Sequence, residues 1–368
     1  MDTLEKNIGT QETERKIKVF IVDDSPLVRR SLEGIISGDP MLEVAETAAD
    51  GKEALDKMSS VSWDVCTLDW QMPGMNGLTV LKHIMIRHLK PTLMLSSFTT
   101  EGARITFDAL RYGAVDFLQK PGGDSGQSLV EHRELLRSRI KRAARVQVGI
   151  TKYLRLKSLT NKKEHLKDGS YEGSNNSKGI ILIFAATGGY ASILSILPSL
   201  SLIPKVPVVV MMSCAQQPLD AFVEYLKDFV LPPVKRLKSK EEGILEQGTI
   251  YFAGLSDRLY LSFNNQGEIL FHLIHKSMSF ELFDIFFDKQ DRWNNKISTI
   301  VLSSGQEEGM KGIKRASEVG SQFIVQEPCT CLDPSLANFV LKNFKADSKG
   351  LLELTQFIGD WTPKDNDQ

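Results

Sequence analysis

The chain has 368 residues, 42% of them hydrophobic and 25% charged, with a formal net charge of -1. This balance is typical of globular proteins, and the length suits two domains rather than one. A near-neutral charge gives no electrostatic basis for nucleic-acid binding, and four cysteines in so long a chain argue against a disulfide scaffold.

The sequence supports neither secretion nor membrane insertion. Residues 1–15 are polar and lack the apolar stretch of a secretory signal. Residues 179–204 are uncharged and long enough for a membrane helix, but Gly188, Gly189 and Pro198 interrupt them. We therefore expect a buried strand, a turn and a helix there, in a cytoplasmic protein with no membrane insertion.

The first third of the chain alternates short apolar runs with amphipathic segments. This alternation predicts βα units on a parallel sheet, in a domain that spans residues 17–123 after a disordered N-terminus of residues 1–16. The expected strands are 19–22, 65–68, 93–95 and 114–118, and the expected helices are 25–37, 51–58, 76–87 and 100–112.

Residues 124–178 are predicted to be a linker. Residues 129–156 form a basic helix with a rough apolar stripe, and residues 161–178 are rich in Gly, Ser and Asn, as in a flexible tether. We expect the helix to be solvated, and the alternative is a docking surface for an acidic partner.

A second α/β domain is predicted over residues 179–346, with a β-rich insert around residues 246–273 and a C-terminal tail of residues 347–368. The expected strands are 180–185, 206–211, 250–252, 260–263, 270–273, 299–302 and 323–325, and the expected helices are 190–196, 219–229, 280–287, 310–318 and 335–344.

Polar side chains follow four of the predicted strands in the first domain. Asp23 and Asp24 close the first strand, and Asp69, Ser96 and Lys120 close later ones. The carboxyl ends of parallel strands share one edge of the sheet, so these side chains are predicted to meet there. Clustered carboxylates repel each other, and a hard cation such as Mg²⁺ relieves that repulsion, so Asp23, Asp24 and Asp69 are the expected metal ligands.

The same cluster predicts phosphoryl chemistry. Asp69 is a carboxylate nucleophile able to accept a phosphoryl group, whose oxygens the metal and Lys120 would neutralise. Ser96 would donate a hydrogen bond to the attached phosphoryl group, and Phe117 is the candidate for a ring that repacks when Ser96 moves. Each residue alone has an ordinary structural explanation, but all of them in this order point to one site.

Residues 17–123 resemble a response-regulator receiver, with features of the chemotaxis methylesterase (CheB) subtype. The resemblance implies a flavodoxin-like fold with a parallel five-stranded sheet, Mg²⁺ as the cofactor, and phosphorylation of Asp69 by a chemotaxis histidine kinase. The segments that carry it are Ile21-Val-Asp-Asp-Ser-Pro26, Thr67-Leu-Asp-Trp-Gln-Met-Pro-Gly-Met-Asn-Gly77, Met94-Leu-Ser-Ser97 and Ala114-Val-Asp-Phe-Leu-Gln-Lys-Pro121.

The second domain resembles the methylesterase domain of the same family, which implies a doubly wound α/β fold. The family has an Ala-Ser-Thr-Gly-Gly turn, a strand ending Gln-His-Met and a Leu-Thr-Gly-Met-Gly-x-Asp-Gly segment. The corresponding segments here are Ala185-Ala-Thr-Gly-Gly189, Met212-Ser-Cys214 and Leu302-Ser-Ser-Gly-Gln-Glu-Glu-Gly309, and Gly248-Thr-Ile-Tyr-Phe-Ala253 also resembles a family run.

That family uses a Ser, His and Asp triad to hydrolyse glutamate methyl esters on methyl-accepting chemoreceptors. The three triad positions here hold Ala186, Ser213 and Glu308. Ala186 has no nucleophile and Ser213 cannot accept a proton near neutral pH, so we expect little or no esterase activity. The candidates to replace these groups are Thr187, Cys214, His272 and His275.

Three functional hypotheses follow. The first is a phosphorylation-controlled regulator in chemotaxis whose output domain is inactive or very weak as an esterase. The alternative is a working protein-glutamate methylesterase and glutamine deamidase with an atypical active site. A DNA-binding regulator would need a compact basic helix-turn-helix module, which the long, strand-rich second domain does not provide.

Overall fold

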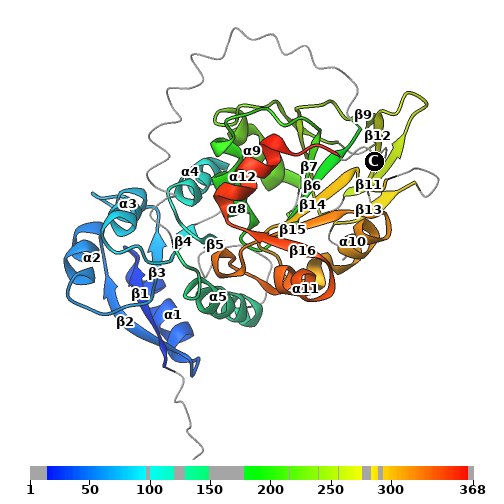
Figure 1. Cartoon of the computed structure of the whole chain (residues 1–368). Coiled ribbons are helices and arrows are strands. Elements are labelled where there is room, and N and C mark those ends of the chain that lie inside the picture. The colour runs from blue at the N-terminus through cyan, green and yellow to red at the C-terminus, as the bar shows by residue number, and fades with distance from the viewer. Residues whose placement is uncertain are drawn as a thin grey trace, which may run out of the picture.

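The computed structural model describes residues 15–96, 100–119, 129–148, 178–214, 216–238, 240–255, 257–275, 283–288 and 293–363. Two α/β domains lie side by side in Figure 1, the first coloured blue to teal and the second green to red. No helix within these described ranges is both long and apolar enough to span a bilayer.

The first domain has a five-stranded parallel sheet in the order β2-β1-β3-β4-β5, as predicted. One strand, β2, was missing from the sequence prediction, because its burial is mostly intermediate and it carries two glutamates. The elements are β1 (Ile17–Val22), α1 (Pro26–Ser37), β2 (Leu42–Ala48), α2 (Gly51–Met58), β3 (Val65–Asp69), α3 (Gly77–Arg87), β4 (Thr92–Ser96), α4 (Thr100–Arg111), β5 (Asp116–Gln119) and α5 (Leu129–Ala143).

Local sequence signals start the first three helices. The Ser25 side chain accepts a hydrogen bond from the Val28 N–H, and Pro26 occupies the first position of α1. Asp50 and Asn76 cap α2 and α3 in the same way. These caps fix the helix starts, so that α1 and α2 begin within four residues of the preceding strand, whereas residues 70–76 separate β3 from α3.

Helix α5 corrects the predicted linker. Leu136, Ile140 and Ala143 are buried against β-strand side chains in the cluster that also holds α1. A parallel sheet needs helices on both faces, and α1 and α5 cover one face while α2, α3 and α4 cover the other. The helix is therefore part of the first domain, not a solvated connector, and the domain extends to residue 143. The predicted flexible tether falls almost wholly outside the described residues.

The second domain is built on a seven-stranded sheet in the order β16-β15-β14-β6-β7-β10-β8, with all described pairings parallel. Helices α8, α9 and α12 cover one face, and α10, α11 and a smaller sheet cover the other. The main elements are β6 (Ile180–Ala185), α8 (Gly189–Ile196), η1 (Leu197–Ser199), β7 (Val208–Met212), α9 (Gln216–Lys227), β8 (Val234–Arg236), β10 (Ile250–Ala253), β14 (Ile297–Val301), α10 (Gln306–Glu318), β15 (Gln322–Gln326), η2 (Pro328–Thr330), α11 (Ser335–Asn343), β16 (Ala346–Lys349) and α12 (Leu351–Asp360).

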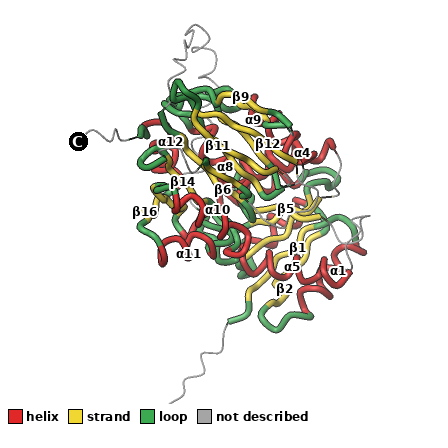
Figure 2. The backbone as a smooth tube through the Cα atoms, turned by 90° about the vertical axis from the view of Figure 1, so that its right-hand side faces the viewer, coloured by secondary structure: helices red, strands yellow, loops and turns green. Residues whose placement is uncertain are grey.

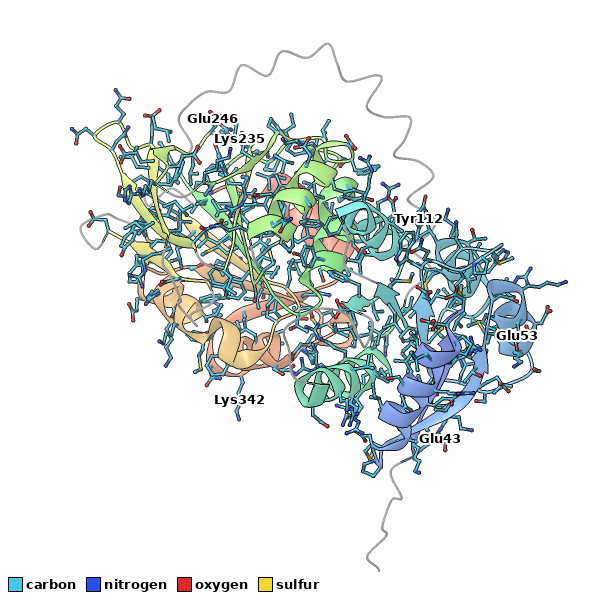
Figure 3. The ribbon with its side chains drawn as sticks, turned by 180° about the vertical axis from the view of Figure 1, so that it is seen from behind. Glu43, Glu53, Tyr112, Lys235, Glu246 and Lys342 are labelled. Atoms are coloured by element: carbon cyan, nitrogen blue, oxygen red, sulfur yellow. The ribbon has the colours of Figure 1, made fainter. Side chains whose placement is uncertain are left out.

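The insert is a four-stranded sheet in the order β13-β11-β12-β9. In Figure 2, where all strands are yellow, the strands of the insert lie separate from those of the first domain. The strands are β9 (Glu242–Ile244), β11 (Asp257–Phe263), β12 (Ile269–His275) and β13 (Ile285–Phe287). In Figure 3, Lys235 and Glu246 lie together on the second domain, and their charged atoms are 2.7 Å apart.

Two sequence predictions for this domain were wrong. The expected helix 280–287 contains strand β13, because three apolar residues pair in register with β11, and such short apolar runs do not distinguish helix from strand. Residues 347–368 were expected to be a tail, but β16 extends the main sheet and Leu354 and Ile358 of α12 are buried in the core.

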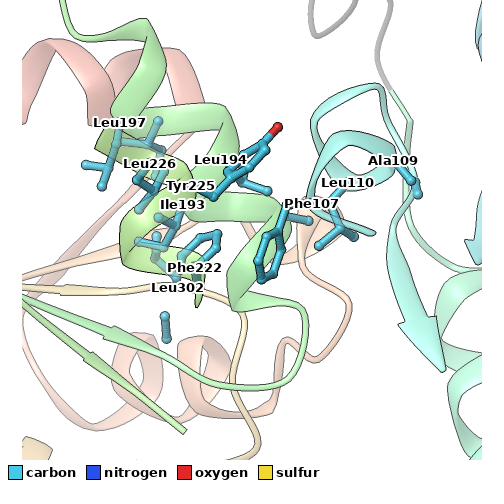
Figure 4. Packing of buried hydrophobic residues seen from close by; sticks show 14 of the residues in the cluster. Phe107, Ala109, Leu110, Ile193, Leu194, Leu197, Phe222, Tyr225, Leu226 and Leu302 are labelled. Atoms are coloured by element: carbon cyan, nitrogen blue, oxygen red, sulfur yellow. The ribbon is translucent and has the colours of Figure 1, made fainter. Parts of the chain in front are cut away.

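An aromatic contact joins the two domains. The Phe107 ring on α4 lies 5.0 Å from Phe222, 5.4 Å from Tyr225 and 5.8 Å from Tyr190, measured between ring centroids. Figure 4 shows Phe107 facing Phe222 and Tyr225 across the junction. The Tyr225 hydroxyl donates a hydrogen bond to the Asp108 carboxylate of α4. One buried hydrophobic cluster thus contains side chains of both domains.

The fold gives a first prediction at Gly77. A Cβ added there would lie 2.0 Å from the Asp69 carbonyl oxygen and 2.7 Å from the Trp70 Cα, both backbone atoms that cannot move aside. Gly77→Ala should therefore lower the free energy of unfolding by about 1–3 kcal/mol or more, as measured by urea denaturation.

Gly34 provides the matched control. It lies within α1, and an added Cβ would contact nothing within 4 Å. Gly34→Ala should raise the free energy of unfolding by about 0.5–1 kcal/mol through helix propensity. Equal effects of the two substitutions would contradict the close approach at Gly77.

Candidate functional site

The acidic cluster lies at the carboxyl edge of two neighbouring strands of the first domain. Asp23 follows β1 and Asp69 ends β3, and these strands are paired in the sheet. One carboxylate oxygen from each of Asp23, Asp24 and Asp69 lies within 4.8 Å of the others. Asp23 and Asp69 are wholly buried, whereas Asp24 is exposed. The sequence prediction that these residues converge agrees with this geometry.

Backbone hydrogen bonds orient the two buried carboxylates. The Ser25 N–H donates to Asp23 Oδ1 at 2.9 Å, and the Gln71 N–H donates to Asp69 Oδ1 at 3.1 Å. An all-oxygen set of three carboxylates, two of them held by the backbone, fits a hard divalent cation such as Mg²⁺. Without a cation, the negative charges repel one another in a buried setting.

The other predicted residues of this site are only partly described. Ser96 ends β4, which lies between β3 and β5, but its side chain is outside the described residues, as is Lys120. Phe117 is described, and its half-buried ring on β5 lies 5.8 Å from the ring of Tyr190 in the second domain. The sequence predicted that the Phe117 ring belongs to the receiver site but gave no indication that it contacts Tyr190.

The second site lies at the carboxyl edge of the seven-stranded sheet. Ala186 follows β6 and Ser213 follows the neighbouring strand β7, and the Ser213 N–H donates to the Ala185 carbonyl at 3.0 Å. Glu308 lies in the first turn of α10, which follows β14 on the other side of β6. The backbone therefore places the three predicted triad positions at the ends of neighbouring strands, although the Glu308 side chain is outside the described residues.

The turn after Ala186 retains a strict backbone geometry. Gly188 has a left-handed φ of 80°, and an added Cβ would meet Leu332 Cβ at 2.6 Å and Ser303 Oγ at 2.8 Å. Only glycine fits such a position. The fold of this turn is thus preserved even though the side chain before it has no functional oxygen.

Ser304 is a further change that the sequence did not single out. Its hydroxyl oxygen accepts a hydrogen bond from the Ala186 N–H at 3.1 Å, and the residue is wholly buried. The Ala186 N–H also contacts the Ser303 carbonyl at 3.1 Å. The family segment that residues 302–309 resemble has glycine at this position. The Ser304 side chain therefore adds a hydroxymethyl group beside Ala186, the predicted nucleophile position. The serine in place of the family's glycine is visible in the segment Leu302–Gly305, but its significance is clear only once its contact with the Ala186 N–H is known.

Cys214 is a poor replacement nucleophile. Burial is the main reason that the pKa of its thiol is raised to about 11, and the Tyr190 hydroxyl, the Arg236 guanidinium and the Asp257 carboxylate are close enough to influence it. A thiol with such a pKa is almost entirely protonated near neutral pH, and the thiolate is the reactive form.

The histidines offer no base in the described part of the cleft. The His272 ring lies on the outer side of the small sheet, about half exposed, with Nδ1 3.4 Å from a carboxylate oxygen of Glu242. The His275 side chain is outside the described residues. The Thr187 carbonyl oxygen accepts a hydrogen bond from the Ser303 hydroxyl. This bond holds the turn against the segment that follows β14 and does not activate an attacking group.

Comparison with known proteins identifies the class. A family model described as a response regulator receiver domain matches residues 19–132, and one described as CheB methylesterase matches residues 181–355. The fold is that of a response regulator with a receiver and a methylesterase-type output domain.

Relatives extend this match over most of the chain, which belongs to the protein-glutamate methylesterase/protein-glutamine glutaminase (CheB) family of chemotaxis response regulators. It is 30% identical over 342 residues to protein-glutamate methylesterase/protein-glutamine glutaminase 3 of Vibrio cholerae, covering 89% of this chain and 91% of that protein. It is 35% identical over 239 residues to the Pyrococcus horikoshii protein-glutamate methylesterase/protein-glutamine glutaminase, covering 65% of this chain and 63% of that protein.

Among solved structures, the response regulator domain of Thermotoga maritima CheB is 42% identical, with a TM-score of 0.33, and covers 36% of this chain and 98% of that chain. The family models and the full-length relatives confirm the family inferred from the sequence, and the two parallel sheets confirm the two-domain α/β fold.

The acidic cluster predicts a stability effect of Mg²⁺. A ligand that binds only the folded state stabilises it, by about 2.7 kcal/mol when the free ion is at 100 times its dissociation constant. MgCl₂ should therefore raise the midpoint of thermal unfolding of the first domain. Asp23→Asn should abolish this increase and should stabilise the Mg²⁺-free protein, because the amide oxygen still accepts from Ser25 while one repelling charge is removed.

The control is Asp56→Asn, on the exposed side of α2, which should respond to MgCl₂ as the wild type does. If the Asp23 variant retained the full increase in the midpoint, the cluster would not be the cation site.

Proposed function

We propose that this chain is a phosphorylation-controlled, non-catalytic regulator of chemotaxis. A chemotaxis histidine kinase phosphorylates Asp69, and the output domain acts by binding, with methyl-accepting chemoreceptors as its target. The observation that carries the non-catalytic part is the pair Ala186 and Ser213, at the two positions where hydrolysis needs an attacking oxygen and a proton acceptor.

The receiver residues support phosphoryl transfer in named roles. One Asp69 carboxylate oxygen attacks the phosphorus of a phosphohistidine, an O–P bond forms, and the N–P bond to the leaving imidazole breaks. Asp23, Asp24 and Asp69 would hold Mg²⁺, which would supply charge neutralisation for the phosphoryl oxygens. The Ser25 and Gln71 N–H groups keep the carboxylates oriented during the transfer.

The domain junction gives this modification a route to the output domain. Phe117 lies on β5, next to the strand that ends at Ser96, and its ring contacts Tyr190. Tyr190 is in the first turn of α8, directly after Gly188 and Gly189, and its hydroxyl neighbours the Cys214 thiol. A change in the Phe117 ring position would therefore reach both chain segments that border the cleft.

Features beyond the two substituted triad positions also oppose esterase activity. Removing the serine or histidine of a comparable triad lowers turnover by about a million-fold. Here both are replaced, the Ser304 hydroxyl lies on the Ala186 N–H, and the neighbouring Cys214 thiol is held protonated by burial. Such a domain keeps its fold for recognition, since its core and its glycine turn are intact.

The alternative is a working protein-glutamate methylesterase and glutaminase with an atypical site. The similarity to the Vibrio cholerae relative, whose name states both activities, favours it. In that case an attacking group and a base would have to come from residues other than those at the triad positions.

Phosphorylation is tested directly with radiolabelled acetyl phosphate and Mg²⁺. We expect the wild type to form an acid-stable, alkali-labile acyl phosphate and Asp69→Asn to show only background label. Asp56→Asn should label normally, because that carboxylate is exposed on α2 away from the cluster. Full labelling of the Asp69 variant would refute the assignment.

Esterase activity is tested by methanol release from methylated chemoreceptor. The wild type, phosphorylated or not, should release methanol at the background rate. The variant Ala186→Ser, Ser213→His, Ser304→Gly supplies a nucleophile and a base and removes the added hydroxyl. Its rate of methanol release should exceed that of the wild type by at least about a hundred-fold, because a complete triad contributes about a million-fold to turnover. Wild-type methanol release that the triple variant does not increase would favour the atypical enzyme.

A further inference from the structure

Helix α5 places three cations against three buried carboxylates. Lys141 contacts Asp39 at 2.7 Å, and Arg139 contacts Asp116, both within the receiver. Arg142 instead reaches into the output domain, where its Nη1 lies 2.8 Å from Asp333 Oδ2. The basic side of this helix is therefore used for internal ion pairs, one of which crosses the domain junction.

Asp333 depends on Arg142 for charge compensation. Its side chain is only 4% exposed. Oδ1 accepts hydrogen bonds from the N–H and hydroxyl of Ser335 at the start of α11, whereas Oδ2 faces the guanidinium. Arg142 is the cation paired with this carboxylate among the described residues. Loss of the Arg142 guanidinium while the domains stay docked would leave a buried charge without its counter-ion, which is costly.

Asp333 is also linked by its backbone to the cleft. The Asp333 N–H donates to Ser303 Oγ at 2.9 Å, and the Ser303 hydroxyl donates to the Thr187 carbonyl. In the other direction, the Ser304 N–H donates to the Asp333 carbonyl at 2.9 Å. Two hydrogen bonds therefore join the acceptor of Arg142 to the turn that follows Ala186.

A main-chain contact supports the same docking. Past the end of α5, the Gln147 N–H donates to the Cys329 carbonyl at 3.1 Å, in the same loop as Asp333. This contact and the Arg142 ion pair lie at α5, whereas the aromatic contact lies at α4. The receiver is thus held to the output domain at two separate places, at α4 through aromatic contacts and the more exposed Arg104–Asp228 ion pair, and at α5 through the buried Asp333 carboxylate.

We infer that the Arg142–Asp333 ion pair is an interdomain latch, which fixes the receiver on the output domain and, through Ser303, holds the turn at Thr187. Its regulatory meaning rests on the proposed function, but the latch itself does not require phosphorylation or hydrolysis. Because Arg142 is 41% exposed, salt partly screens the pair, so the latch weakens as ionic strength rises.

The test is hydrogen–deuterium exchange on the full-length chain. Arg142→Met keeps an aliphatic stem but removes the charge, and Asp333→Asn keeps an acceptor for Ser335. Each should speed exchange of the interface peptides in α9 and of the peptide covering residues 186–189 by about tenfold, the scale of one partly buried ion pair. The double variant should exchange no faster than the faster single variant, because both remove the same interaction.

Lys141→Met is the matched control. It removes a cation from the adjacent position of α5, with similar exposure of both partners, but its acceptor Asp39 belongs to the receiver. It should leave exchange in α9 and in residues 186–189 unchanged. Equal acceleration by Lys141→Met and Arg142→Met, or no acceleration by either Arg142→Met or Asp333→Asn, would overturn the latch. Neither result would alter Asp69 labelling or methanol release, so failure of the latch is distinguishable from failure of the proposed function.

Discussion

Parallel strand pairing brings the carboxyl ends of neighbouring strands to one edge of each sheet, and both sites are built on that edge. In the receiver it forces Asp23 and Asp69 together from paired strands and buries both carboxylates. The electrostatic cost of that crowding would be relieved by a bound cation, which is the physical basis of the proposed cation and phosphoryl site. In the output domain the same geometry brings the Ala186 and Ser213 backbones together.

The two edges therefore differ in chemistry while sharing an architecture. The receiver edge keeps charged oxygens that backbone N–H groups hold in place. The output edge keeps its glycine turn but has an aliphatic side chain at the nucleophile position, a serine at the base position and the Ser304 hydroxyl beside them. This difference is the basis of the proposed function, in which the receiver is phosphorylated and the output domain acts by binding.

The junction between the domains is what would connect these two edges. Apolar contact at Phe107 and an ion pair at Arg142 hold the receiver against the output domain at different helices. The Phe117 ring, which is expected to respond to the phosphorylation site, contacts Tyr190 in α8, the helix that follows the turn after Ala186. Regulation by repacking at this junction needs no large separation of the domains.

The sequence by itself determined the two α/β domains, the acidic residues at the strand ends of the receiver and the residue types Ala186 and Ser213 that follow two strands of the output domain, because strand-end motifs and residue chemistry are local properties. It could not place α5, β13, β16 or α12, since those elements are defined by what they cover or pair with. Only the tertiary structure decided that Phe117 contacts Tyr190, that Ser304 lies on the Ala186 N–H and that Arg142 reaches Asp333. These contacts join residues that are 73, 118 and 191 positions apart, and packing alone determines which such residues meet.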